Sequence, residues 1–260
     1  MLTKIPVLTC LIFAVIYPLC FWISYQDPLK NKFHKFHIGL ADFLGAIAVI
    51  SLFSMNISAS SKNLLLIWII LLFIVPAYYW NKDYPSPTLL TIPSVIGLAA
   101  FAQIQNQLIG PTPSQAGLIF IGILAGCILC ASAFTMNLGH WYLNVHGLDI
   151  NHLLRATYVY WGFVVIRFLW DVYQVLTAKI LYQGDWVSLP QFMLHIDGFL
   201  LLIAFFFGTL FPLVTLYFVK GTLQVKSTQS ATGILYVILS AVLIGDITYK
   251  YYLIKYGLIL

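Results

Sequence analysis

The sequence contains no glutamate, and charged residues of every kind are scarce. All eight acidic residues are aspartates, and Asp, Glu, Lys and Arg together make up only 8% of the 260 residues. Soluble domains carry about 25% charged residues, so this composition excludes an ordinary soluble protein. The net charge of +5 is small and spread over several loops, and it gives no indication of a nucleic-acid partner.

Several motifs of soluble enzymes are also missing. The sequence has no glycine-rich phosphate loop, no H-E-x-x-H zinc motif, no G-x-S-x-G elbow and no C-x-x-C-H haem attachment. Four cysteines lie in apolar runs, and the C-x-x-C formed by Cys127 and Cys130 has no second pair beside it. We interpret these cysteines as packing residues and do not expect a stand-alone enzyme of the soluble type.

Long apolar runs take the place of the missing charge. Hydrophobic residues make up 61% of the chain and the mean hydropathy is +0.93. A helix needs about 20 apolar residues to cross a ~30 Å hydrocarbon layer. The sequence therefore predicts an all-α integral membrane protein with short loops, folded as a single polytopic transmembrane domain over 1–260. The predicted spans are 5–25, 38–58, 63–81, 87–107, 116–141, 152–180, 191–219 and 230–254.

Eight crossings put both termini on the same side of the membrane, here called side A. The opposite side B receives Lys30, Lys32, Lys35, Lys82, Arg155, Lys220 and Lys226, whereas side A receives Lys4, Lys62, Lys179, Lys250 and Lys255. Cytoplasmic loops carry the excess of lysine and arginine. The pattern therefore predicts a cytoplasmic side B, with both termini on the non-cytoplasmic side of a bacterial-type inner membrane.

Five ionisable residues are predicted at similar depth in the side-A half of the membrane. Arg167 and Asp171 share one face of the sixth span, because residues four apart are neighbours on a helix. His195 and Asp197 are expected one to two turns into the seventh span, and Asp246 about one turn from the end of the eighth.

These five residues admit two interpretations. A carboxylate, a histidine and an arginine in a wetted pocket would bind a quinone or exchange protons, and ionisable groups at membrane depth are often functional. The alternative is a network of salt bridges that only fixes the packing of the helices. The sequence leaves both open.

Three histidines recur around the turn between the fifth and sixth spans. His140, His146 and His152 are six residues apart, with Asp149 and Arg155 beside them. Two histidines on adjacent helices can ligate one haem b, and three with a carboxylate can hold a divalent metal. Histidine is also common at membrane interfaces, so an ordinary turn is the other interpretation.

The first side-B loop alternates cations with aromatic residues. Such a pattern suits anionic lipid headgroups or the surface of a partner protein. The predicted docking residues are Lys30, Lys32, His34, Lys35 and His37.

Three functional hypotheses follow. The first is an integral subunit of a larger respiratory or electron-transfer complex, structural or contributing a quinone-binding or proton-handling pocket, with other membrane subunits and lipids as partners. The second is a small ion-coupled transporter, which prolines inside spans such as Pro76, Pro93 and Pro212 favour. The third is a membrane oxidoreductase that holds haem b between His140 and His152.

Overall fold

The structure, a computed structural model, describes residues 3–25, 29, 32–112, 114–145 and 147–260. Within these residues, eight helical segments are long and apolar enough to cross a membrane. They run from Lys4–Ser24 to Thr228–Tyr256, in the order that the apolar runs predict. The multi-pass, helical membrane character of the chain is thereby confirmed.

The chain folds into two compact units, residues 2–134 and residues 135–260. We call them the N-terminal unit and the C-terminal unit. The boundary falls within the long helix α5 (Gln115–Asn144). The interpretation of residues 1–260 as one polytopic domain stays a prediction, and each unit is described separately below.

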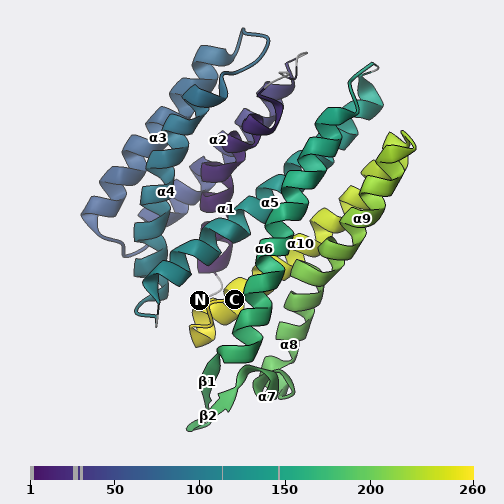
Figure 1. The fold of residues 1–260 in the computed structure, drawn as a ribbon. Helices are drawn as coiled ribbons and strands as arrows, with labels where there is room; N and C mark the ends of the chain where they lie inside the picture. The colour runs from purple at the N-terminus through teal and green to yellow at the C-terminus, as the bar shows by residue number, and fades with distance from the viewer. Residues whose placement is uncertain (1–2, 26–28, 30–31, 113, 146) are drawn as a thin grey trace. The chain divides into compact units, whose positions relative to one another are not determined.

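The first helix forms the centre of the N-terminal unit. Leu11, Ile12, Ala14 and Val15 on this helix are fully buried. Gly126 of α5 lies against it so closely that a Cβ atom there would approach the Ile12 side chain to 2.3 Å. The elements of this unit before α5 are α1 (Lys4–Ile16), the 3₁₀ helix η1 (Tyr17–Ser24), α2 (Phe33–Phe53), α3 (Ala59–Tyr79) and α4 (Pro87–Ile109), with α3 and α4 side by side (Figure 1).

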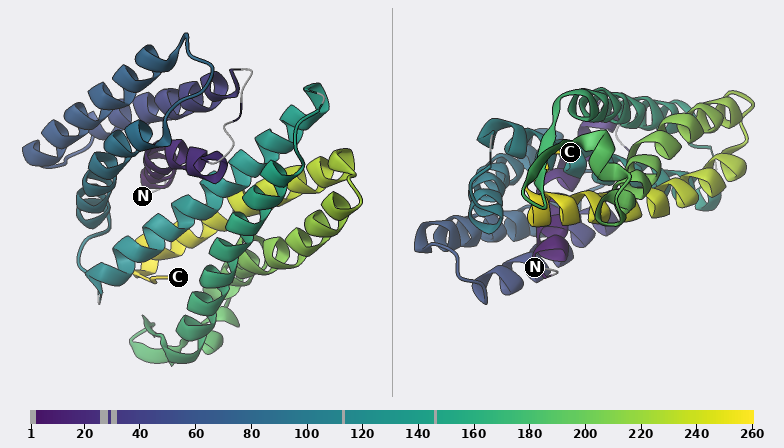
Figure 2. Two further views of the ribbon diagram at one scale, coloured as in Figure 1. Left: turned by 45° about the horizontal axis from the view of Figure 1, so that its top comes forward. Right: turned by 90° about the horizontal axis from the view of Figure 1, so that it is seen from below.

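The C-terminal unit is built on three long helical segments. Helix α9 packs against both α6 and α10, and a small hairpin and a short helix lie at one end of α6 (Figure 2). Its elements after α5 are α6 (Asn151–Thr177), β1 (Lys179–Tyr182), β2 (Asp185–Ser188), α7 (Leu189–Met193), α8 (Ile196–Phe205), the π-helical turn η2 (Phe206–Leu210), α9 (Phe211–Gln224) and α10 (Thr228–Tyr256).

The hairpin is a departure from the purely helical prediction. Strands β1 and β2 pair antiparallel, with Lys179 opposite Ser188. The two residues between the strands, Gln183 and Gly184, both have positive φ, at 54° and 96°, as two-residue hairpin turns require. A capping box between Ser188 and Gln191 then starts α7. The seventh crossing therefore begins at Ile196 instead of residue 191.

A π-helical turn interrupts the seventh crossing. Element η2 separates α8 from α9, and Pro212 stands directly after it in the first turn of α9. Because proline has no backbone N–H, one hydrogen bond of this continuous helical segment cannot form there. Pro76 and Pro93 lie inside α3 and α4, as the sequence indicates. Single π-helical turns are frequent at functional sites, and η2 contributes to the site described below.

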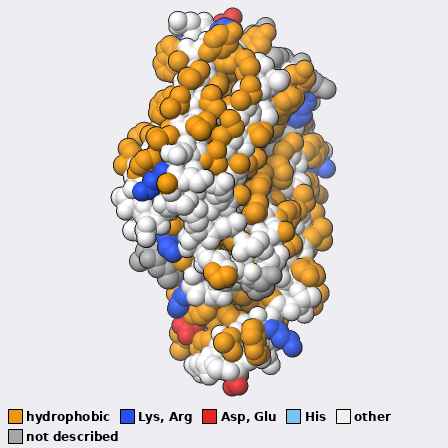
Figure 3. Space-filling view, turned by 90° about the vertical axis from the view of Figure 1, so that its left-hand side faces the viewer, with side chains coloured by type: hydrophobic (Ala, Val, Ile, Leu, Met, Phe, Trp, Pro, Cys, Tyr) orange, Lys and Arg blue, Asp and Glu red, His pale blue; other side chains and the backbone are white. Residues whose placement is uncertain are grey.

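The outer surface is dominated by apolar side chains. The face drawn in Figure 3 carries many hydrophobic groups and few charges. Large residues such as Phe43, Ile50 and Leu169 are more than 60% exposed. This much exposed apolar surface is unfavourable in water, whereas lipid tails solvate it well.

Candidate functional site

The interior of the C-terminal unit contains a buried ion pair. Arg167 and Asp171 lie one turn apart on α6, with Nε of the arginine 3.1 Å from Oδ1 of the aspartate. Their exposed fractions are only 2% and 1%. Removing two charges from water costs several kcal/mol for each ion, which the pair recovers only through close contact and further hydrogen bonds.

Two hydroxyl groups supply these hydrogen bonds. Thr209 in η2 and Tyr249 in α10 both donate to Oδ2 of Asp171, each at 2.6 Å. The two hydroxyl oxygens are 3.0 Å apart. The guanidinium carbon of Arg167 lies 3.9 Å from the centre of the Tyr249 ring, a cation–π contact. Three helical segments thus meet at a single carboxylate.

A second ion pair lies on α10, on the face of the helix that carries Tyr249. Asp246 and Lys250 are buried and four residues apart, and the ammonium group of Lys250 contacts both carboxylate oxygens of Asp246. Tyr249 stands between Asp246 and Lys250 in the sequence of α10, within one helical turn of both. We call Arg167, Asp171, Thr209, Asp246, Tyr249 and Lys250 the buried network. Two cations face two carboxylates, so the formal charges of the network cancel.

Close packing of two glycines allows these helices to meet. A Cβ atom on Gly245 would lie 2.3 Å from the Cα of Gly208, and one on Gly208 would lie 2.7 Å from the Tyr249 ring. Only glycine fits at both positions with this geometry. Thr209 and Tyr249 are direct neighbours of this contact, which explains how their hydroxyl groups reach Asp171.

The buried network retains unused donor capacity. Nη2 of Arg167 is buried and has no hydrogen-bond partner among the described residues. A guanidinium has five N–H donors and cannot lose its charge in a protein. Buried donors of this kind are rare in folded proteins and call for an explanation. In the buried network this leaves the Nη2 donor of Arg167 unassigned.

The structure brings together three of the five residues predicted for this site. Arg167, Asp171 and Asp246 belong to the buried network, whereas His195 and Asp197 are exposed. The seventh crossing was expected to begin at residue 191, whereas α8 begins at Ile196. His195 is therefore the N-terminal cap of α8 and Asp197 stands in its first turn.

The exposed residues form a separate cluster near the hairpin. The hydroxyl of Tyr182 donates to Asp197 at 2.9 Å, and this hydrogen bond raises the pKa of Tyr182 above its usual value. Lys255 approaches Asp197 to 3.9 Å, and the ring of His195 lies 5.1 Å from that of Tyr182. Such exposed pairs contribute little to stability.

Thr209, Tyr249 and Lys250 were not among the site residues predicted from sequence. Lys250 lies four residues after Asp246, a spacing that indicates an ion pair. Tyrosine and threonine are also frequent in membrane helices that have no functional site. Their presence alone therefore did not predict a role for Thr209 or Tyr249. Their roles depend on η2 and the glycine contact, which are features of the folded chain.

The structure describes two of the three histidines predicted for haem or a metal. His140 is exposed, with Nδ1 3.0 Å from the hydroxyl of Tyr236, and His152 is buried in the first turn of α6. His146 lies outside the described residues. Among the residues that are described, no group of three His, Cys, Asp or Glu side chains is placed to hold a metal ion.

Asp149 has a structural role beside these histidines. Its carboxylate accepts hydrogen bonds from the backbone N–H and the side-chain amide of Asn151, at 3.1 and 2.9 Å. These bonds lower the pKa of Asp149 below its usual value. The carboxylate thereby stabilises the start of α6, as a side chain at a helix N-terminus commonly does.

Two of the predicted docking residues lie inside the N-terminal unit. His37 is 2% exposed. Its Nδ1 lies 2.7 Å from the Tyr17 hydroxyl, and the rings of Phe21, Phe33 and Phe134 surround it. His34 is buried too, with Nε2 3.1 Å from the backbone oxygen of Tyr79. Both histidines face inward because α2 begins at Phe33, five residues earlier than predicted.

The lysines of the same segment are placed differently. Lys32 is exposed and Lys35 is half-buried, while Lys30 lies outside the described residues. Nζ of Lys35 lies 4.9 Å from the centre of the Trp80 ring. A docking role for this segment stays a prediction, and among its described docking residues Lys32 is the one that is exposed.

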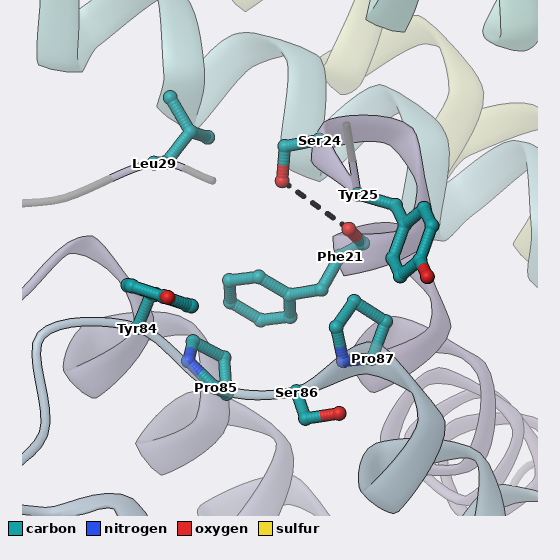
Figure 4. A pocket seen from close by; sticks show the side chains of 8 residues that line it. All are labelled: Phe21, Ser24, Tyr25, Leu29, Tyr84, Pro85, Ser86 and Pro87. Carbon is teal, nitrogen blue, oxygen red and sulfur yellow. Dashed lines mark hydrogen bonds between the residues drawn. The ribbon is translucent and has the colours of Figure 1, made fainter. Parts of the chain in front are cut away.

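A small cavity in the N-terminal unit was not expected from the sequence. It has a volume of about 140 Å³, and Figure 4 shows the ring of Phe21 pointing across it towards Tyr84 and Pro85. Ser24 at its edge donates to the backbone oxygen of Phe21 at 3.2 Å. Among the residues that the structure describes, its lining side chains include no carboxylate, histidine or lysine, and the buried network remains the better candidate for chemistry.

Comparison with protein-family models, curated proteins and solved structures finds no match for this chain.

Proposed function

We propose that the chain is an integral subunit of a larger electron-transfer complex in a bacterial-type inner membrane, with its termini on the non-cytoplasmic side. In this proposal the buried network handles protons for that complex. The observation that carries it is the Asp171 carboxylate, which accepts two hydroxyl hydrogen bonds and an arginine contact in the interior of the C-terminal unit. Ionisable groups at membrane depth are functional candidates by default.

The chemistry of the buried network suits proton exchange. Asp171 is the proton acceptor, and the hydroxyl groups of Tyr249 and Thr209 are both donors and acceptors within 3.0 Å of each other. Arg167 cannot lose its proton, so its guanidinium provides a permanent positive charge that orients the carboxylate. The remaining donor at Arg167 Nη2 suits the carbonyl oxygen of a quinone, whose reduction consumes two protons with two electrons from a partner subunit.

The short connections between helices support the role of a subunit. Residues 54–58, 110–114 and 225–227 join successive long helices, and the hairpin of residues 179–188 is the main extramembrane feature of the C-terminal unit. A chain with so little mass outside the membrane has little surface for capturing a soluble substrate. Its exposed apolar side chains suit lipids and other membrane subunits equally well.

An ion-coupled transporter is the second candidate function. The observation in its favour is the π-helical turn η2, which interrupts a crossing next to the buried charges. Interrupted helices near ionisable groups carry the substrate and ion sites of many transporters. Haem binding by His140 and His152 has no comparable support, and it stays a prediction from their spacing.

The test begins with the full chain, purified in mild detergent from its own membrane. We expect a large assembly by native mass analysis. A particle of the chain's own mass that moves a solute in liposomes would instead establish the transporter. Within the assembly, Asp171→Asn should slow proton-coupled electron transfer at least tenfold, whereas Asp185→Asn at the exposed start of strand β2 should leave it unchanged.

A second variant separates proton handling from assembly. Tyr249→Phe removes one hydroxyl and keeps both charges, so the complex should assemble normally while its turnover shifts in pH dependence. Intact assembly with an unchanged pH profile in both Asp171→Asn and Tyr249→Phe would leave the buried network as a packing device and refute the proposed role.

A further inference from the structure

An apolar groove runs between α3 and α4 in the N-terminal unit. Its volume is about 250 Å³ and its inner wall is entirely apolar. Leu71, Ile74 and Tyr78 line one side at the three- and four-residue spacing of a single helix face, and Ile92 and Pro93 of α4 line the other. The groove therefore follows the axes of two membrane-crossing helices.

The shape of the groove limits what can occupy it. Leu71 and Tyr78 are seven residues apart, so the groove is about 10 Å long at ~1.5 Å per residue. An apolar wall of this length suits part of an extended hydrocarbon chain that lies along the two helices.

Cations stand over aromatic rings at one end of the groove. Nζ of Lys82 lies 3.6 Å from the centre of the Tyr78 ring and 5.3 Å from that of Tyr79. Lys35 lies over Trp80, and both Tyr78 and Trp80 are more than half exposed. Exposed tyrosine and tryptophan rings mark the headgroup layer of a membrane, so these ammonium groups are expected at the depth of lipid phosphates.

We propose that the groove and its cationic end form a binding site for one anionic phospholipid. The acyl chain lies along Leu71, Ile74 and Ile92, and the phosphate group contacts Lys82 and Lys35. Asp83 follows Lys82 in the chain and Lys32 stands at the N-terminus of α2, so three lysines are weighed against one carboxylate in the two segments that carry Lys35 and Lys82. The site belongs to the N-terminal unit and is independent of the buried network.

The test compares two lipids on the purified full chain. Native mass spectrometry in detergent counts bound phosphatidylglycerol and phosphatidylcholine with identical acyl chains. We expect tighter binding of phosphatidylglycerol, and a loss of about 25-fold in its affinity for Lys35→Gln/Lys82→Gln, because each lysine near an anionic headgroup contributes about fivefold. Phosphatidylcholine should be little affected by this change.

A matched variant controls for the loss of charge. Lys62→Gln/Lys179→Gln removes two lysines as well, and Lys62 also stands over an aromatic ring, that of Phe53, at the opposite ends of α2 and α3. This variant should keep its affinity for phosphatidylglycerol. Ile74→Trp keeps every lysine and fills the groove, so it should weaken the binding of both lipids.

Several results would overturn the proposal. Equal affinities of the unaltered chain for the two lipids would remove the charge argument, and an equal loss in both lysine pairs would remove the site. Normal lipid binding by Ile74→Trp would exclude the groove. If Lys35→Gln/Lys82→Gln released a co-purifying protein while retaining phosphatidylglycerol, the cationic end would be a protein-docking surface instead.

Discussion

Gly245 packs directly on Gly208, so that the backbones of α10 and η2 touch at this point. A Cβ atom at Gly245 would lie 2.3 Å from the Cα and 2.5 Å from the nitrogen of Gly208. Small residues permit this approach in membrane proteins, where association of helices depends on close packing. The contact sets the distance between the segments that carry Thr209 and Tyr249.

Gly245→Ala should therefore destabilise the C-terminal unit. The added methyl group meets backbone atoms, which cannot rotate away, and overpacking of this kind typically costs about 1–3 kcal/mol. Thermal unfolding of the purified protein in detergent measures the loss. Gly233→Ala on the same helix is the control, because a Cβ atom there has open space around it. It should be neutral or stabilise by up to about 1 kcal/mol. Equal melting temperatures for the two variants would contradict the glycine contact.

Arg167 and Asp171 should be more costly to replace singly than together. Arg167→Gln leaves a buried carboxylate without its counter-charge, and breaking a buried ion pair from one side costs about 3–5 kcal/mol. The double variant Arg167→Gln/Asp171→Asn leaves no unpaired charge of this pair and should recover part of that loss. A double-mutant cycle on thermal or denaturant unfolding gives the coupling free energy between the two residues. Strictly additive effects would show that the two charges do not interact.

His37→Ala should reveal whether this histidine is part of the core or of a docking surface. The imidazole is enclosed by aromatic rings and joined to Tyr17, so its removal leaves a cavity and should cost about 2–4 kcal/mol. His195→Ala, at an exposed helix cap, should cost less than about 0.5 kcal/mol. Unfolding experiments on both variants check the difference. A melting temperature unchanged by His37→Ala would show that the residue is not part of the core.

The sequence predicted the crossings better than the residues that join them. Apolar runs of about 20 residues are a strong signal because each crossing must satisfy the membrane thickness by itself. The hairpin of residues 179–188 has only four residues in each strand, too few to show a period. Its turn requires positive φ at both Gln183 and Gly184. Glutamine rarely adopts positive φ, so its presence did not predict this turn.

Only part of the candidate site was predicted, again because the sequence shows local patterns better than it shows where helices begin and end. The Arg167–Asp171 pair follows from spacing along one helix, which is a local property. His195 and Asp197 were included because the seventh crossing was predicted to begin at residue 191. The helix begins at Ile196 instead, and both residues are exposed at its start. Helix boundaries are the least reliable element of a sequence-based prediction.

The sequence by itself determined that this chain is a multi-pass helical membrane protein with ionisable residues inside it. Composition decides this, since a chain with so few charges has its lowest free energy in lipid. Only the tertiary structure decided which polar groups meet. Thr209 and Tyr249 reach Asp171 because a π-helical turn and two glycines bring separate helices together, and hydrogen bonds between distant segments depend on three-dimensional distance, which a residue's position in the chain does not encode.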